Sequence, residues 1–322
     1  MNCVKKIVWP MLVGVLVSSI GMVGAPVMAA TTATTGTVAA NTAVGETGPS
    51  MKDVATTTTT EVAITTKSLY STSLPVPAFA AEAAVLIEAE TGRILVAHNE
   101  NKRLHPASTT KMVTLLTALK KQGTRLDELA TISPYATSME ESNLGVRTTD
   151  QLPLQAVAEG MMVASGNDAA VVVAENVSGS VYRFALAMNE VAKAAGATNS
   201  HFLNPHGLTE VGHYSTALDL AKIAAYGMRI PMFRDFVGDD FYKVPYENRK
   251  PQWVRTTNHF IRSQYRGANG LKTGYTEAAG ECLIASATRD GHTLIVVLLN
   301  DDNRWVDAPA LLDYGFAVLK QS

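Results

Sequence analysis

The chain has 322 residues, of which 47% are hydrophobic and 17% charged, with a formal net charge of -2. This composition is typical of a globular protein with a hydrophobic core, and the absence of a basic stretch makes nucleic acid an unexpected partner. The only cysteines are Cys3 and Cys282. We therefore expect no disulfide in the folded domain and a buried, unreactive thiol at Cys282, which lies in an apolar run.

The first 29 residues have the features of a secretory signal peptide. Lys5 and Lys6 precede an apolar run over 7–25, and "VMAA" at 27–30 offers small residues for cleavage. An uncleaved membrane anchor is the alternative, because the run is close to the length that spans a bilayer. Either way, we expect export to the periplasm, the cell wall or the extracellular face of the cytoplasmic membrane.

Residues 30–78 are rich in threonine, alanine, serine and glycine, with few charges. Such a segment cannot bury enough apolar surface to offset the entropy of ordering, so we expect a linker without a fold of its own. The folded domain is expected over 79–322. It begins with two β-rich runs over 83–99, and Gly92 marks the turn between them.

Helical patterns follow this hairpin, and β patterns return in the last third of the chain. Apolar periodicity predicts helices over 108–122, 152–164, 168–177, 181–195, 216–229 and 304–320. Strands are predicted over 270–276, 281–290 and 293–300, the last two joined through "RDGH". The pattern indicates an α+β fold: one sheet built from both ends of the chain, with an inserted helical lobe and a cleft between them.

The stretch "HPASTTKM" contains Ser108 and Lys111 at S-x-x-K spacing. Taken alone this pair is weak evidence, because Ser108 can be a helix cap and Lys111 a surface residue. Residues i and i+3 nevertheless share a helix face, so the Lys111 amine can reach the Ser108 hydroxyl as a base. A lysine base must be neutral, which requires burial or a second cation nearby.

Two later motifs complete a catalytic pattern. Ser165 and Asn167 lie in "ASGNDAA" between two apolar helices, and "LKTGYT" supplies Lys272 as the second cation on a strand. Gly274 is expected to leave that strand edge free for a substrate backbone. The three motifs together, in this order, are far less expected by chance than any one of them.

S-x-x-K, S-x-N and K-T-G in this order are the motif set of penicillin-binding proteins and class A β-lactamases. The chain resembles the low-molecular-weight D-alanyl-D-alanine carboxypeptidases in particular, also through the stretches "FLNPHGL", "GHYSTALDLAKIA" and "RWVDAPALLDYGF". The resemblance covers nearly all of 80–318. It implies an antiparallel sheet flanked by helices, with a helical lobe, that removes the terminal D-alanine from peptidoglycan stem peptides through a serine ester.

The resemblance also implies a role for each site residue. Ser108 would be the nucleophile and Lys111 the general base. Ser165 would relay a proton to the leaving amine, Lys272 would act on Ser165 electrostatically, and Asn167 would position Lys111 and the substrate amide.

The substrate-binding residues follow from the same resemblance. The backbone amides of Ser108 and Tyr275, beside Gly274, would form the oxyanion hole. Thr273 and Arg304 would bind the terminal carboxylate, the alternative for Arg304 being a solvated residue at a helix start. The expected partners are stem peptides and, as covalent inhibitors, β-lactams. No cofactor and no metal are expected, and the protein is expected to be a monomer.

Several alternatives remain open on sequence grounds. A class A-like β-lactamase would need a deacylating glutamate some 35 residues after the middle motif, where none is visible; a D,D-endopeptidase and a non-catalytic wall-binding module are the others. A zinc carboxypeptidase is not expected, because no H-E-x-x-H occurs, and His206 and His213 are interpreted as structural. Many relatives continue into a β-rich domain and an anchor helix, whereas this sequence ends at Ser322, so we do not expect that route of membrane attachment.

Overall fold

The structure is a computed structural model that describes residues 74–122 and 126–321. The predicted signal peptide and most of the predicted linker lie outside the described residues. Leu74 and Val76, at the end of the predicted linker, already pack against a buried apolar cluster. No helix among the described residues is long and apolar enough to cross a membrane.

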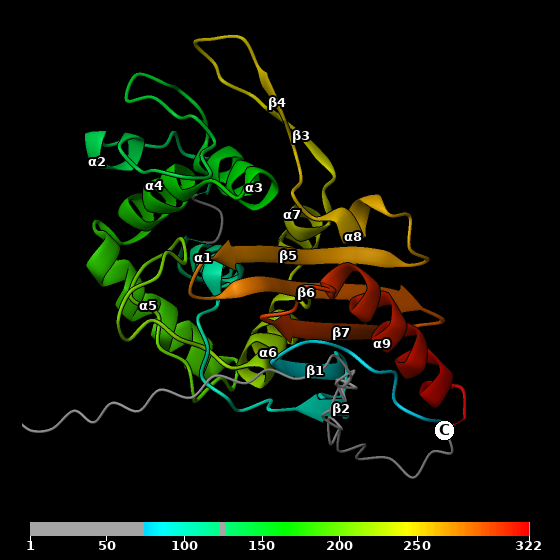
Figure 1. Cartoon of the computed structure of the whole chain (residues 1–322). Coiled ribbons are helices and arrows are strands. Elements are labelled where there is room, and N and C mark those ends of the chain that lie inside the picture. Colours follow the sequence, from blue (N-terminus) through cyan, green and yellow to red (C-terminus); the bar gives the residue numbers. More distant parts are fainter. Residues whose placement is uncertain (1–73, 123–125, 322) are drawn as a thin grey trace, which may run out of the picture. The chain divides into compact units, whose positions relative to one another are not determined.

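A five-stranded antiparallel sheet joins the two ends of the described chain (Figure 1). The strand order is β2-β1-β7-β6-β5, and β1 pairs with both β2 and β7. The predicted sheet from both chain ends is therefore confirmed, including the β6–β7 hairpin. The strands are β1 (Ala83–Glu88), β2 (Ile94–His98), β5 (Ala268–Thr276), β6 (Gly280–Arg289) and β7 (His292–Leu299).

All six predicted helices are present, with ends shifted by one or two residues. The first starts with a 3-10 turn, so the catalytic serine lies in the turn and the lysine in the α-helix. These elements are η1 (Ala107–Thr109), α1 (Thr110–Gln122), α3 (Leu154–Ala164), α4 (Asn167–Ser178), α5 (Val181–Ala194), α6 (Ala217–Gly227) and α9 (Arg304–Leu319).

Short elements were not predicted because each is too brief to show a period. They are α2 (Pro134–Thr137), α7 (Pro231–Gly238), α8 (His259–Arg262) and the hairpin of β3 (Phe241–Val244) and β4 (Gln252–Arg255). One face of this hairpin carries the exposed side chains of Phe241 and Trp253. The partly buried Tyr242 and Val254 of the other face pack against the main hydrophobic cluster.

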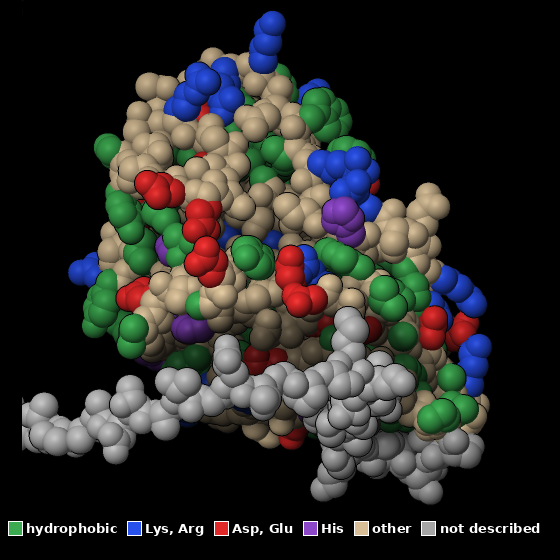
Figure 2. All heavy atoms as spheres, in the orientation of Figure 1, with side chains coloured by type: hydrophobic (Ala, Val, Ile, Leu, Met, Phe, Trp, Pro, Cys, Tyr) green, Lys and Arg blue, Asp and Glu red, His purple; other side chains and the backbone are tan. Residues whose placement is uncertain are grey.

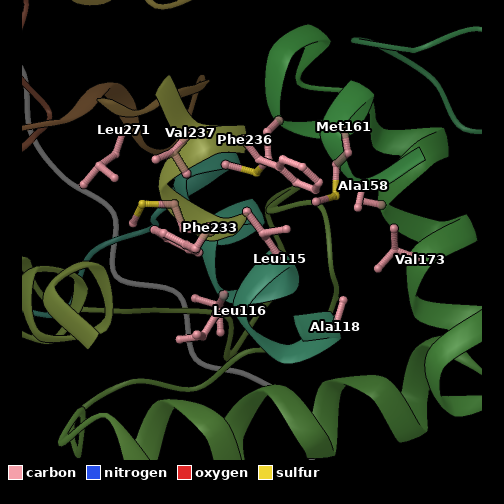
Figure 3. Packing of buried hydrophobic residues seen from close by; sticks show 14 of the residues in the cluster. Leu115, Leu116, Ala118, Ala158, Met161, Val173, Phe233, Phe236, Val237 and Leu271 are labelled. Atoms are coloured by element: carbon pink, nitrogen blue, oxygen red, sulfur yellow. The ribbon is translucent and has the colours of Figure 1, made fainter. Parts of the chain in front are cut away.

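Alternate residues of β7 enter two different hydrophobic clusters, one on each face of the sheet. Ile295 and Val297 belong to the larger cluster, which includes α1, α3, α4 and α6, whereas Val296 and Leu298 pack with residues of α9. Figure 3 shows the larger cluster near α1, where Leu115 and Leu116 lie near Phe233 of α7. This packing holds α1, and with it the start of the helix at the nucleophile, against the sheet.

Candidate active site

The turn that carries Ser108 is packed closely against strand β5. A Cβ on Gly274 would lie 3.0 Å from the Ala107 Cβ and 3.1 Å from the Ser108 nitrogen. The missing side chain of Gly274 is therefore used by the protein's own turn. This differs from the predicted reason, which was space for a substrate backbone; β5 is nonetheless the edge strand of the sheet, as that prediction required.

Lys111 is fully buried and surrounded by three oxygen atoms. Its Nζ lies 2.9 Å from Ser108 Oγ, 2.7 Å from Asn167 Oδ1 and 2.8 Å from the His206 carbonyl oxygen. A neutral amine has two N–H groups and one lone pair. It can donate to the Asn167 and His206 oxygens while its lone pair accepts the Ser108 hydroxyl proton.

The electrostatics favour this neutral form. Burial, followed by the positive charge of Lys272, holds the pKa of Lys111 well below its usual value, although Asp168 and Glu141 act in the opposite direction. Lys272 is itself 2% exposed, and burial lowers its pKa to about 7. The predicted arrangement, a buried Lys111 with Lys272 as the nearby second cation, is confirmed.

Lys272 and Ser165 meet across the cleft between sheet and helical lobe. The Lys272 Nζ donates to Ser165 Oγ at 3.0 Å and to the Thr273 carbonyl at 3.0 Å. Ser165 caps α3 in a left-handed conformation with φ of 59°, which ends that helix and lets α4 begin at Asn167. The two serines are thus each paired with a buried lysine.

Asp168, the residue after Asn167, holds a loop beside the site. Its carboxylate accepts hydrogen bonds from the backbone nitrogens of Leu144, Gly145 and Val146. Asn167 adds a bond from its own nitrogen to the Ser142 carbonyl at 2.7 Å. Sequence analysis did not predict this role, because nothing in the 139–146 segment indicates that it folds back onto α4.

A cavity of about 350 Å³ lies in front of the two serines. The predicted site residues that line it are Ser108, Ser165, Thr273, Gly274, Tyr275 and Arg304. Lys111, Asn167 and Lys272 lie behind them, in contact with the serines. Lining residues that were not predicted are Glu141, Ser142, Thr257 and Glu281; the Thr257 hydroxyl lies 2.8 Å from that of Thr273.

Arg304 lies at the cavity wall as predicted, but it already has an anionic partner. The guanidinium Nη1 forms an ion pair with Glu281 Oε2, and the arginine side chain is only 12% exposed. The alternative of a solvated residue at a helix start does not fit this burial. Sequence analysis missed Glu281 because the pairing depends on how the start of α9 meets the start of β6.

The "NPHGL" segment supports the nucleophile from the opposite side. Gly207, with φ of 91°, leaves no room for a Cβ against the Ala107 carbonyl. The rings of His206 and His213 accept hydrogen bonds from the Leu208 and Leu203 nitrogens, so their predicted structural role is confirmed. The use of the His206 carbonyl by Lys111 was not predicted.

Other reactive groups lie apart from these contacts. Within 74–122 and 126–321, no group of three or more histidine, cysteine, aspartate or glutamate residues could hold a metal ion. Cys282 is buried and burial raises the pKa of its thiol to about 11, as expected for an unreactive cysteine.

Comparison with known proteins places the chain in a family. The sequence profile of the D-alanyl-D-alanine carboxypeptidases, peptidase S11, matches residues 70–303, most of the chain. The chain belongs to this family. The resemblance inferred from the sequence motifs is therefore confirmed.

Members of the D-alanyl-D-alanine carboxypeptidase family align with this chain over the folded domain. DacF of Bacillus subtilis is 38% identical over 246 residues, covering 74% of this chain and 62% of DacF. DacB2 of Mycobacterium tuberculosis is 30% identical over 260 residues, covering 78% of this chain and 87% of DacB2. The chain spans about three fifths of the length of DacF and of Haemophilus influenzae DacA, 62% and 63%.

Solved structures give the same family fold. The Streptomyces K15 DD-transpeptidase matches with a TM-score of 0.71 at 30% identity, covering 76% of this chain and all of that chain. A D-alanyl-D-alanine carboxypeptidase of M. tuberculosis matches with a TM-score of 0.71 at 29% identity and 95% coverage of that chain. The predicted α+β fold is confirmed by these matches and by the sheet described above.

Proposed function

We propose that this chain is a serine-type D-Ala-D-Ala carboxypeptidase that removes the terminal D-alanine from peptidoglycan stem pentapeptides. The observation that carries the proposal is Lys111, buried 2.9 Å from Ser108 Oγ with its pKa well below the usual value. Membership of the carboxypeptidase family and the names of its relatives support the choice of substrate.

Acylation begins when neutral Lys111 takes the hydroxyl proton of Ser108 and the serine oxygen attacks the carbonyl carbon of the penultimate D-alanine. The amides of Ser108 and Tyr275 stabilise the oxyanion; a donor of this kind contributes about 3–4 kcal/mol in the transition state. The proximity of the Ser108 nitrogen to Gly274 supports this pairing of amides. Collapse breaks the peptide bond and leaves an ester on Ser108.

The leaving group of this step is the amine of the terminal D-alanine. Ser165 donates its proton to that nitrogen and is itself resupplied through the lysines, Lys272 lying 3.0 Å from its hydroxyl. Thr273 and Arg304, on the cavity wall, bind the terminal carboxylate. Water, deprotonated by Lys111, then attacks the ester, and Ser108 regains its proton.

Peptidoglycan lies outside the cytoplasmic membrane, so the protein acts after export, as a monomer. β-Lactams acylate Ser108 in place of the peptide, because they present a strained amide to the same nucleophile. The Thr-rich linker over 30–78 connects the exported N-terminus to the domain.

The test uses the purified protein with a diacyl-Lys-D-Ala-D-Ala peptide and with benzylpenicillin. We expect release of D-alanine and, by intact-protein mass spectrometry with peptide mapping, one penicillin adduct on Ser108. Ser108→Ala should lose both. An adduct on another residue, or rapid penicillin turnover without D-alanine release, would contradict the proposal and favour a β-lactamase.

A further inference from the structure

Glu281 lies beside the reaction centre although no motif includes it. It stands at the start of β6 directly opposite Tyr275 of β5. Side chains of directly opposed residues lie on one face of an antiparallel pair, about 5 Å apart at Cβ. Figure 2 shows acidic side chains gathered around this end of β5 and β6. Glu281 and Tyr275 both line the catalytic cavity.

The backbone fixes Glu281 and Arg304 next to each other. The Asp301 nitrogen donates to the Glu281 carbonyl at 2.7 Å, and the Arg304 nitrogen donates to the Asp301 carbonyl at 3.2 Å. These two bonds connect the start of β6 to the start of α9, so the ion pair between the side chains is built into the fold. It is partly shielded from water, with 12% of the arginine and 34% of the glutamate side chain exposed.

Arg304 still has binding capacity that faces no partner. Its Nε is buried and makes no hydrogen bond to any described residue. A guanidinium carries five N–H donors, enough for two carboxylate partners in geometry. In charge it is matched by one, because a second carboxylate is repelled by the first at close range.

We infer that Glu281 is a specificity-determining residue that competes with the substrate's terminal carboxylate for Arg304. The inference rests on the proposed function and refines it. A stem peptide must displace Glu281 from the guanidinium or bind beside its negative charge, so a free C-terminal carboxylate gains less than an unpaired arginine would give it. The pocket thereby accepts peptides without that carboxylate with a smaller loss than an unpaired arginine would cause.

The variant Glu281→Gln removes the charge and keeps an oxygen that can accept from Arg304. Two substrates are compared, diacyl-Lys-D-Ala-D-Ala and the same peptide with a C-terminal amide. We expect KM for the carboxylate peptide to fall by about three- to tenfold, the range of one partly exposed ion pair. The kcat values and the KM for the amide peptide should remain as in the wild type.

A matched control is Glu277→Gln, which removes the same charge from an exposed residue of the turn after β5 that does not line the catalytic cavity. It should leave the ratio of the two KM values unchanged. Glu281→Ala is the second variant if the glutamine form melts at a lower temperature than the wild type, and it should lower the same KM.

An unchanged or raised KM for the carboxylate peptide in both Glu281 variants would overturn the inference; a rise would mean that Glu281 only holds Arg304 in place. A fall shared equally by the amide peptide would overturn it too, since the effect would not involve the carboxylate. Failure of the proposed function is seen separately, as wild-type protein that releases no D-alanine and forms no penicillin adduct.

Discussion

Two buried lysines at one site have different tasks because their neighbours differ. Lys111 has three oxygen partners and a second cation nearby, which favours its neutral form. Lys272 has fewer partners, and its pKa is lowered by burial alone, to about 7. The proposed mechanism needs Lys111 neutral and Lys272 charged. Activity should therefore be confined to a window of pH between the two proton losses.

The upper edge of this window can be moved by one substitution. As pH rises, the rate should first increase while Lys111 loses its proton and then fall as Lys272 loses its own. In Lys272→Arg the guanidinium stays charged, so the fall should shift to higher pH while the rise stays in place. The measurement is the penicillin acylation rate from pH 5 to 10. A falling limb at the same pH in both proteins would show that Lys272 does not set it.

Gly274 is required where the nucleophile turn meets the sheet. In Gly274→Ala the new Cβ would press on Ala107 and on the Ser108 nitrogen, which are fixed by backbone on both sides. We expect the acylation rate to drop by about 10²-fold, since small displacements at a reacting group have effects of this size. Stopped-flow acylation by penicillin measures it.

The control for Gly274→Ala is Gly238→Ala at the end of α7, where the added Cβ meets its nearest atom at an ordinary 3.5 Å. That variant should acylate as the wild type does. Equal rates for both variants would mean that the close approach at Gly274 has no catalytic consequence.

At the scale of elements, α3 is central because it ends at Ser165 and also contacts α7 and the β3–β4 hairpin. Glu159 of α3 lies close to Asp239, at the end of α7, and to Tyr242. Burial, followed by the negative charge of Asp239, raises the pKa of Glu159 to about 8. At neutral pH the folded protein therefore binds this proton more tightly than the unfolded chain does.

A raised carboxyl pKa makes stability depend on pH in a definite direction. The stabilising contribution of protonated Glu159 is complete below its usual pKa near 4.5 and is lost as pH rises through about 8. Glu159→Gln should flatten this decline, so that its melting temperature exceeds that of the wild type by roughly 3 °C more at pH 8.5 than at pH 5. Differential scanning calorimetry tests this. Parallel melting curves at both pH values would contradict it, and Glu277→Gln serves as the exposed control.

At the scale of the whole domain, stability depends on the cluster between the sheet and the helical lobe. Phe233 of α7 is fully buried in it, and its ring fills the space beside Gly227 of α6. Phe233→Ala should lower the free energy of unfolding by about 3–5 kcal/mol, a large part of a typical total of about 5–15 kcal/mol. Urea unfolding measures the change.

The exposed Phe241 of the β3–β4 hairpin offers the matched comparison, since its side chain is 53% exposed. Phe241→Ala should change the same free energy by less than about 0.5 kcal/mol. Similar losses for the two phenylalanines would mean that the cluster is not where the stability lies.

The extent to which sequence predicted this molecule follows from the range of each interaction. Periodicity over ten or more residues located the long helices, and motif spacing located Ser108, Lys111, Ser165 and Lys272, because local patterns encode them. Glu281, Thr257 and the loop held by Asp168 depend on contacts between segments that are distant in the chain. Such contacts leave no local pattern, so they required the three-dimensional structure.

The position of β1 between β2 and β7 has a consequence for biosynthesis. A growing polypeptide has made β1 long before β7 exists, so one edge of β1 stays open until nearly the last segment emerges. The reactive serine likewise waits for Lys272, synthesised much later. Incomplete chains therefore lack hydrolytic power, and the protein gains its activity only at the end of synthesis.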